Sequence, residues 1–100
     1  MNLKDRKILI TGANGGLGRA MAASAAENGA VVAVCERTQS LADAARDALP
    51  EALRAQAHPF AADLTDEAAV ATMVTDIATT MGTLDGLVNN AAILTDDDTD

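Results

Sequence analysis

A glycine-rich segment near the start of the chain has residues and spacing that could bind a phosphate group: Thr11-Gly12-Ala13-Asn14-Gly15-Gly16-Leu17-Gly18. It lies between an apolar run typical of a strand and an alanine-rich run typical of a helix, which is the context of phosphate-binding loops. Gly12 permits a sharp turn, Gly16 permits close approach of a ligand, and Gly18 permits close packing of the helix on the sheet. The first N–H groups of that helix lack intrahelical partners and carry the positive end of its dipole, so a pyrophosphate would bind there.

The spacing G-x-x-x-G-x-G also fits a loop whose glycines serve only close packing. Residues further along the chain are therefore needed to distinguish a nucleotide site from a packing loop. Glu36-Arg37 ends the next apolar run, 18 residues after Gly18. A carboxylate at about that distance accepts hydrogen bonds from the ribose hydroxyls of an adenosine and repels a 2′-phosphate. Arg37 could neutralise such a phosphate, and an exposed ion-pair dipeptide is the alternative. The pair therefore favours NAD and leaves NADP open.

Two further polar pairs follow predicted strands. The carboxylate of Asp63 could bind an adenine amino group, and the backbone of Leu64 could contact the ring. Alternatively, Asp63 is an ordinary loop residue that precedes the third helix. Asn89 and Asn90 end a buried strand, where an unpaired amide costs about 1–3 kcal/mol. They could bridge neighbouring strands or contact a ribose, and the small Ala91 leaves room for a ligand.

The hydrophobic pattern predicts the elements that position these residues. Apolar runs predict strands over residues 7–11, 30–35, 55–62 and 84–89. Helical spacing predicts a helix over about 16–28, a second capped by Ser40 and ending near Pro50, and a third capped by Thr65 and ending before Gly82. For the second, a further turn from Glu51 to Arg54 is the alternative. We expect the first helix to turn these residues inward: Leu17, Met21, Ala20, Ser24 and Ala25.

Alternating strands and helices predict an α/β fold with a doubly wound parallel sheet of strand order 3-2-1-4. Pro59 lacks a ladder donor, so the third strand belongs at the outer edge, and His58 beside it is interpreted as solvated rather than as a metal ligand. The strand order reverses beside the first strand. The crevice between the first and fourth strands therefore lies at the glycine loop, where open α/β sheets bind ligands.

Composition narrows the function classes. The chain has 100 residues, enough for one domain. It is rich in alanine and has one aromatic residue, Phe60, so its core has a small side-chain volume, which indicates that the chain is part of a larger protein. A net charge of −8 argues against nucleic acid and anionic membranes as partners. The single Cys35 excludes an internal disulfide. There is no transmembrane-length apolar run and no signal-peptide pattern, so we expect a cytoplasmic protein.

Three motifs in this order resemble the short-chain dehydrogenase/reductase (SDR) family: Thr11–Gly18, Asp63-Leu64 and Asn89-Asn90-Ala91. The resemblance covers residues 7–94, and Ala92 departs from it because the family usually has glycine there. It implies a Rossmann-type fold, a nicotinamide cofactor, and hydride transfer to or from an alcohol or carbonyl substrate, in a parent that is a homo-oligomer. The implied cofactor-binding residues are Gly12, Asn14, Gly15, Gly16, Leu17, Gly18, Glu36, Arg37, Asp63, Leu64, Asn90 and Ala91.

The family's catalytic residues are a serine and a Tyr-x-x-x-Lys pair beyond the Asn-Asn-Ala-Gly motif, and this chain contains no tyrosine. Ser24 and Ser40 lie elsewhere, so no residue is assigned as catalytic. We interpret residues 1–100 as a single dinucleotide-binding domain, truncated before the catalytic half of an NAD(P)-dependent oxidoreductase. A non-catalytic nucleotide-binding or regulatory module is the alternative.

Overall fold

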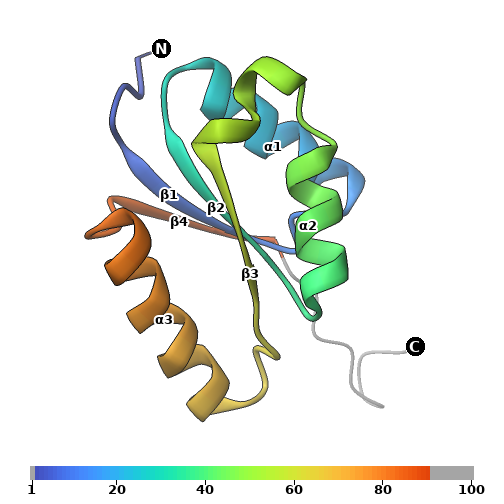
Figure 1. The fold of residues 1–100 in the computed structure, drawn as a ribbon, viewed down its shortest axis with the longest axis vertical. Coiled ribbons are helices and arrows are strands. Elements are labelled where there is room, and N and C mark those ends of the chain that lie inside the picture. Colours follow the sequence, from blue (N-terminus) through green and yellow to red (C-terminus); the bar gives the residue numbers. More distant parts are fainter. Residues whose placement is uncertain (1, 91–100) are drawn as a thin grey trace.

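The computed structural model describes residues 2–90, which form a parallel sheet with helices on both faces (Figure 1). The strand order is β3-β2-β1-β4, as the sequence predicts. The elements in chain order are β1 (Lys7–Thr11), α1 (Gly16–Glu27), β2 (Val31–Glu36), α2 (Gln39–Asp47), the 3-10 helix η1 (Glu51–Gln56), β3 (Ala57–Ala61), α3 (Glu67–Met81) and β4 (Gly86–Asn89).

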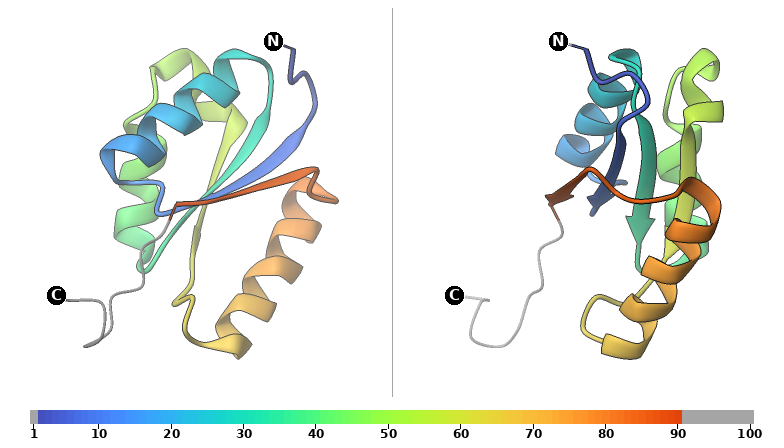
Figure 2. Two further views of the ribbon diagram at one scale, coloured as in Figure 1. Left: turned by 180° about the vertical axis from the view of Figure 1, so that it is seen from behind. Right: turned by 90° about the vertical axis from the view of Figure 1, so that its left-hand side faces the viewer.

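Two apolar layers hold the helices on the sheet. On one face, Val32 and Val34 of β2 pack in one cluster with residues of α1 and α2. The residues that alternate with them, Ala33 and Cys35, pack in the second cluster with α3, whose buried contacts are Met73, Ile77 and Met81. The left view of Figure 2 shows α1 and α2 on one side of the strands and α3 on the other. β4 forms the edge of the sheet opposite β3. Because successive side chains of a strand point to opposite faces, β2 is buried on both.

The parallel register brings the carboxyl ends of the strands to one side of the sheet. Thr11 pairs with Cys35 of β2 and with Asn89 of β4, and Glu36 pairs with Ala61 of β3. The predicted site residues at the ends of β1, β2 and β4 therefore share one rim. Pro59 lies in β3, at the outer edge of the sheet, as its missing N–H requires.

Both predicted helix caps were wrong. Thr38, not Ser40, caps α2, because its hydroxyl accepts a hydrogen bond from the N–H of Leu41 at 3.2 Å. Asp66, not Thr65, caps α3, and its carboxylate accepts from two first-turn N–H groups at 3.0 and 3.2 Å. A carboxylate that reaches both N–H groups satisfies more of the helix end than one hydroxyl can.

The predicted inward face of α1 was also partly wrong. Leu17 is 59% exposed, and Ala20 and Ser24 are exposed as well, although Ala25 is buried and Met21 half-buried. The buried residues are Gly18, Ala22, Ala25 and Ala26. Gly18 lies against the backbone of the glycine loop, and residues four, seven and eight positions later must then face the sheet.

Within residues 2–90, no helix combines the length and the apolar character needed to cross a membrane. The same residues hold no group of three or more His, Cys, Asp or Glu side chains placed to bind a metal ion.

Candidate functional site

The glycine loop turns sharply from β1 into α1, as its spacing predicts. Gly12 has a φ of 61°, in the left-handed region that favours glycine. A Cβ added to Gly18 would lie 2.3 Å from the carbonyl oxygen of Gly12, so only glycine allows the helix to approach the loop this closely. A Cβ added to Gly16 would meet nothing within 4 Å. The loop is therefore tight at Gly12 and Gly18 and open at Gly16.

The N-terminus of α1 differs from those of the other two α-helices. Its N-cap residue is Gly15, which has no side chain to cap the helix, and its first turn holds no acidic residue. The N-termini of α2 and α3, in contrast, are capped by Thr38 and Asp66. The partial positive charge of the α1 N-terminus is thus not offset by a side chain of its first turn, and this end of the helix suits an anion.

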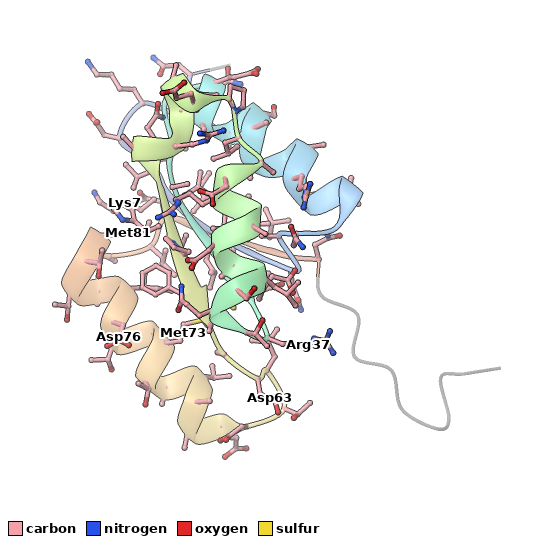
Figure 3. The ribbon with its side chains drawn as sticks, turned by 45° about the vertical axis from the view of Figure 1, so that its right-hand side comes forward. Lys7, Arg37, Asp63, Met73, Asp76 and Met81 are labelled. Carbon is pink, nitrogen blue, oxygen red and sulfur yellow. The ribbon has the colours of Figure 1, made fainter. Side chains whose placement is uncertain are left out.

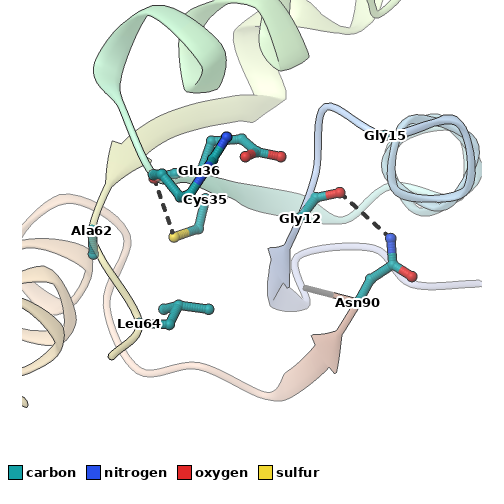
Figure 4. A pocket seen from close by; sticks show the side chains of 8 residues that line it. Gly12, Gly15, Cys35, Glu36, Ala62, Leu64 and Asn90 are labelled. Carbon is teal, nitrogen blue, oxygen red and sulfur yellow. Dashed lines mark hydrogen bonds between the residues drawn. The ribbon is translucent and has the colours of Figure 1, made fainter. Parts of the chain in front are cut away.

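A pocket of about 320 Å³ opens beside this loop (Figure 4). Its lining residues come from the loop and from the ends of β2, β3 and β4: Gly12, Gly15, Cys35, Glu36, Arg37, Ala62, Leu64 and Asn90. Six of them are predicted site residues. The other two, Cys35 and Ala62, were not predicted from the sequence. Cys35 lies near the end of β2 and Ala62 directly follows β3, and these positions at the carboxyl ends of strands could have indicated a place in the site.

Glu36 is joined to the glycine loop by a hydrogen bond that the sequence did not predict. Its Oε2 accepts from the backbone N–H of Asn14 at 2.9 Å. The side-chain oxygen of Asn14 in turn accepts two hydrogen bonds from Arg19, from Nε at 3.1 Å and from Nη2. Asn14 therefore serves as a bridge between the first turn of α1 and the end of β2, although it does not line the pocket.

Asp63 is engaged in its own turn. Its Oδ1 accepts from the Thr65 hydroxyl at 2.7 Å and from the Thr65 N–H at 2.9 Å. These two bonds, with a smaller contribution from the charge of Arg37, hold the pKa of Asp63 below its ordinary value. Figure 3 shows Arg37 and Asp63 at the same end of the sheet. Leu64 lines the pocket and Asp63 does not, so the predicted contact of Asp63 with adenine stays a prediction.

The two asparagines join β4 to β1. The Thr11 hydroxyl donates to Oδ1 of Asn89 at 3.0 Å and accepts from the Asn90 N–H at 3.0 Å. The Asn90 side-chain amide donates to the carbonyl of Gly12 at 3.4 Å (Figure 4). One of the two predicted roles, bridging neighbouring strands, is thereby confirmed. Ala91 lies outside the described residues.

Cys35 is buried at the floor of the site. Burial raises the pKa of its thiol, and the neighbouring charge of Glu36 raises it further. A thiol with a raised pKa is a poor nucleophile at neutral pH, so Cys35 acts as a core residue and not as a nucleophile.

Comparison with known proteins defines the class to which this fold and site belong. The profile of the short chain dehydrogenase family matches residues 6–100. The chain therefore belongs to the short-chain dehydrogenase/reductase family, which confirms the predicted family and Rossmann-type fold. It corresponds to the N-terminal, cofactor-binding portion of that fold.

Particular relatives show how much of such a protein the chain represents. It is 41% identical over 91 residues to 2-(S)-hydroxypropyl-CoM dehydrogenase 3 of Xanthobacter autotrophicus, covering 91% of this chain and 35% of that protein. It is 38% identical over 94 residues to the short-chain dehydrogenase/reductase homolog YusS of Bacillus subtilis, covering 93% of this chain and 85% of that protein. The crystal structure of a short chain dehydrogenase from Bacillus anthracis superposes with a TM-score of 0.81 at 28% identity, covering 92% of this chain and 37% of that one. The chain thus spans about a third of two of these proteins and most of the third.

Proposed function

We propose that the site binds a nicotinamide dinucleotide, NAD in preference to NADP, and supplies the cofactor-binding part of an oxidoreductase that acts on an alcohol or carbonyl. The observation that carries the proposal is the position of Glu36. Its carboxylate lies in the pocket at the end of β2 and is hydrogen-bonded to the glycine loop through Asn14 at 2.9 Å. When bound, the nicotinamide would accept or donate the hydride.

The residues present fit such a cofactor. The N-terminus of α1, with Gly16 open to the solvent side, suits the pyrophosphate. A carboxylate has two oxygens, and the Asn14 bond uses one, so the second can accept from a ribose hydroxyl. Leu64 and Ala62 offer an apolar wall for the adenine on the other side of the pocket. Asn90 lines the pocket and would lie near a cofactor ribose, the role that the family resemblance implies for Asn90 and Ala91.

The preference for NAD follows from charge. A 2′-phosphate at the ribose would place its negative charge beside the Glu36 carboxylate, and no lysine or arginine lies between Gly12 and Gly18 to offset the repulsion. Arg37 lines the same pocket and acts in the opposite direction. The carboxylate is held towards the loop by its bond to Asn14, whereas no hydrogen bond of the Arg37 side chain is found among residues 2–90. We therefore expect Glu36 to dominate.

Titration of the 100-residue chain with both cofactors tests the proposal. The chain contains no Trp and no Tyr, so the emission of the reduced nicotinamides can be followed without protein background. NADH is expected to bind more tightly than NADPH, and Glu36→Ala is expected to reduce or reverse the difference. Glu27→Ala is the matched control, because it removes the same charge from the opposite end of α1. Tighter binding of NADPH to the unaltered chain would show that Arg37 governs the pocket.

The remaining proposals concern the protein in its cellular setting. We propose a small alcohol or carbonyl as substrate, a homo-oligomeric parent and a cytoplasmic location, with neither nucleic acid nor membrane as partner. The family membership supports the first two, and the net charge of −8 supports the exclusion of nucleic acid and anionic membranes.

A further inference from the structure

We propose that Arg19 is a positioning residue for cofactor choice, which acts on Glu36 through Asn14. The inference rests on the proposed function and adds a residue that does not line the pocket. Its basis is a continuous series of hydrogen bonds from the first turn of α1 to the end of β2.

The side chain of Glu36 is the least constrained member of this series of hydrogen bonds. The backbone of Glu36 is fixed by the parallel ladder with β3 and by the bond from the Ala62 N–H to its carbonyl at 3.0 Å. Its side chain has three rotatable bonds, and within residues 2–90 the Asn14 N–H is the hydrogen-bond partner found for its carboxylate. The direction of the carboxylate therefore depends on where the Asn14 peptide group points.

Arg19 controls that peptide group from the other side. Two nitrogens of its guanidinium converge on the Asn14 side-chain oxygen, and the Arg19 N–H anchors the residue in the helix by donating to Gly15 at 2.8 Å. Asn14 is thus held at its side chain by α1 and at its backbone by β2. A planar guanidinium donates through both nitrogens in a fixed geometry, which an ammonium group cannot reproduce.

The charge of Arg19 must be separated from its hydrogen bonds. A cation near the helix N-terminus attracts any dinucleotide, and it attracts the additional phosphate of NADP more strongly. Loss of charge alone would therefore lower the affinity for NADP and raise the preference for NAD. Loss of the contact that holds Asn14 would release Glu36 and lower the preference for NAD. The two effects have opposite signs, so Arg19→Lys, which keeps the charge, isolates the positioning role.

A double-mutant cycle tests the inference. The variants are Arg19→Lys, Asn14→Ala and the two combined, and the quantity measured is the ratio of the dissociation constants of NADPH and NADH. We expect each single variant to lower the ratio about fivefold, the effect of losing one exposed charge-assisted contact. The combined variant should lower it no further. Arg46→Lys is the matched control, because Arg46 is on α2 and, among the described residues, its side chain bonds only to its neighbour Asp47.

Amide hydrogen exchange of the ligand-free chain is a second, independent measurement of the hydrogen bond between Asn14 and Glu36. The Asn14 amide should exchange fastest in Glu36→Ala, which removes its acceptor, and at an intermediate rate in Arg19→Lys. A ratio that changes in Glu36→Ala but not in Arg19→Lys or Asn14→Ala would overturn the role of Arg19 and leave the proposed function standing. A ratio unchanged in Glu36→Ala would overturn both, whereas the exchange rates would still report whether Arg19 holds the loop.

Discussion

The backbone N–H of Asn90 donates to the hydroxyl of Thr11 at 3.0 Å, which joins the end of β4 to the end of β1. The same hydroxyl lies 3.0 Å from Oδ1 of Asn89, and Thr11 is 4% exposed. One buried hydroxyl therefore contacts Val88 and Asn89, which end β4, and Asn90, which follows it. It stands directly before Gly12, so it also fixes where the glycine loop leaves the sheet.

Replacement of Thr11 should therefore loosen the junction of β1 and β4. Thr11→Val keeps the shape of the side chain but removes the hydroxyl partner of the half-buried Asn90 N–H and of the exposed Asn89, so it should lower the free energy of unfolding by about 0.5–1.5 kcal/mol. Urea denaturation measures the loss. Thr11→Ser is the control, since it keeps the hydroxyl and should keep the Asn90 amide protected from exchange. Equal protection in both variants would contradict the role of the hydroxyl.

The sequence predicted the sheet because its signals there are redundant. Continuous apolar runs, helical spacing and Gly12 with Gly18 all indicate the same strand order and the same loop. The asparagines at 89 and 90 also indicated a need for partners, because the sequence predicted a buried strand there. That burial was wrong, since Asn89 is exposed and Asn90 half-buried at the edge of the sheet, yet both bond to Thr11. Thr11 was not identified as that partner, since the pairing depends on the register of β1 and β4.

The helix caps, the buried face of α1 and the donor to Glu36 were not predicted correctly, because the local sequence does not determine them. Several adjacent polar residues can cap each helix, and the backbone geometry selected Thr38 and Asp66. The phase of α1 is set by one close contact at Gly18 rather than by its apolar residues. The bond to Glu36 comes from a backbone N–H, a group that nearly every residue carries, so no side-chain pattern could reveal Asn14 as its donor.

Gly18 and Gly16 should respond differently to an added methyl group. In Gly18→Ala the Cβ would meet backbone atoms of the loop at 2.3 and 2.8 Å, which cannot move aside as a side chain would. We expect a loss of roughly 1–3 kcal/mol in the free energy of unfolding. Gly16→Ala is the matched control, with nothing within 4 Å of its Cβ. It should unfold like the unaltered chain but bind dinucleotide more weakly, because the methyl group would occupy space proposed for the ligand.

Asp63 should titrate below its ordinary value of 3.8, chiefly because of the Thr65 hydroxyl and N–H. A lowered pKa in the folded state means that the turn is stabilised above pH 3.8 and that this stabilisation is lost as the pH falls through the folded-state pKa. Thr65→Val removes the hydroxyl and should raise the pKa of Asp63. Arg37→Gln should raise it less, since the charge of Arg37 is the weaker cause. Carboxyl NMR titration measures both, and a larger effect of Arg37→Gln would contradict this order.

The β4 edge should make the 100-residue chain associate with itself. Among residues 2–90, β4 pairs only with β1, and Leu87 in it is 63% exposed. Apolar pockets of about 250 and 390 Å³ lie along it, with Val88 lining the first and Leu87 the second. An uncharged edge strand flanked by apolar surface favours pairing with another chain.

Sedimentation velocity at several concentrations should show this association, and Leu87→Lys should reduce it. Ala61→Lys adds the same charge to β3 at the opposite edge, where Pro59 already weakens pairing, and should have little effect. A monodisperse monomer that unfolds cooperatively at high temperature would contradict the prediction.

The 100-residue chain by itself should not reduce carbonyls or oxidise alcohols at a measurable rate. Hydride transfer to a carbonyl leaves an alkoxide that needs a proton donor close to the nicotinamide, and the family uses a tyrosine, a residue that this chain lacks. The groups that line the pocket offer no replacement. Glu36 stands at the position proposed for the adenosine ribose, Cys35 is buried with a raised pKa, and Asn90 carries an amide that does not titrate. The purified chain should therefore bind NADH without consuming it when a carbonyl is added, as followed by nicotinamide absorbance. A mock preparation from the same host detects contaminating enzymes. Turnover above that background, and weakened by Gly16→Ala, would show that the described site holds a proton donor of another kind.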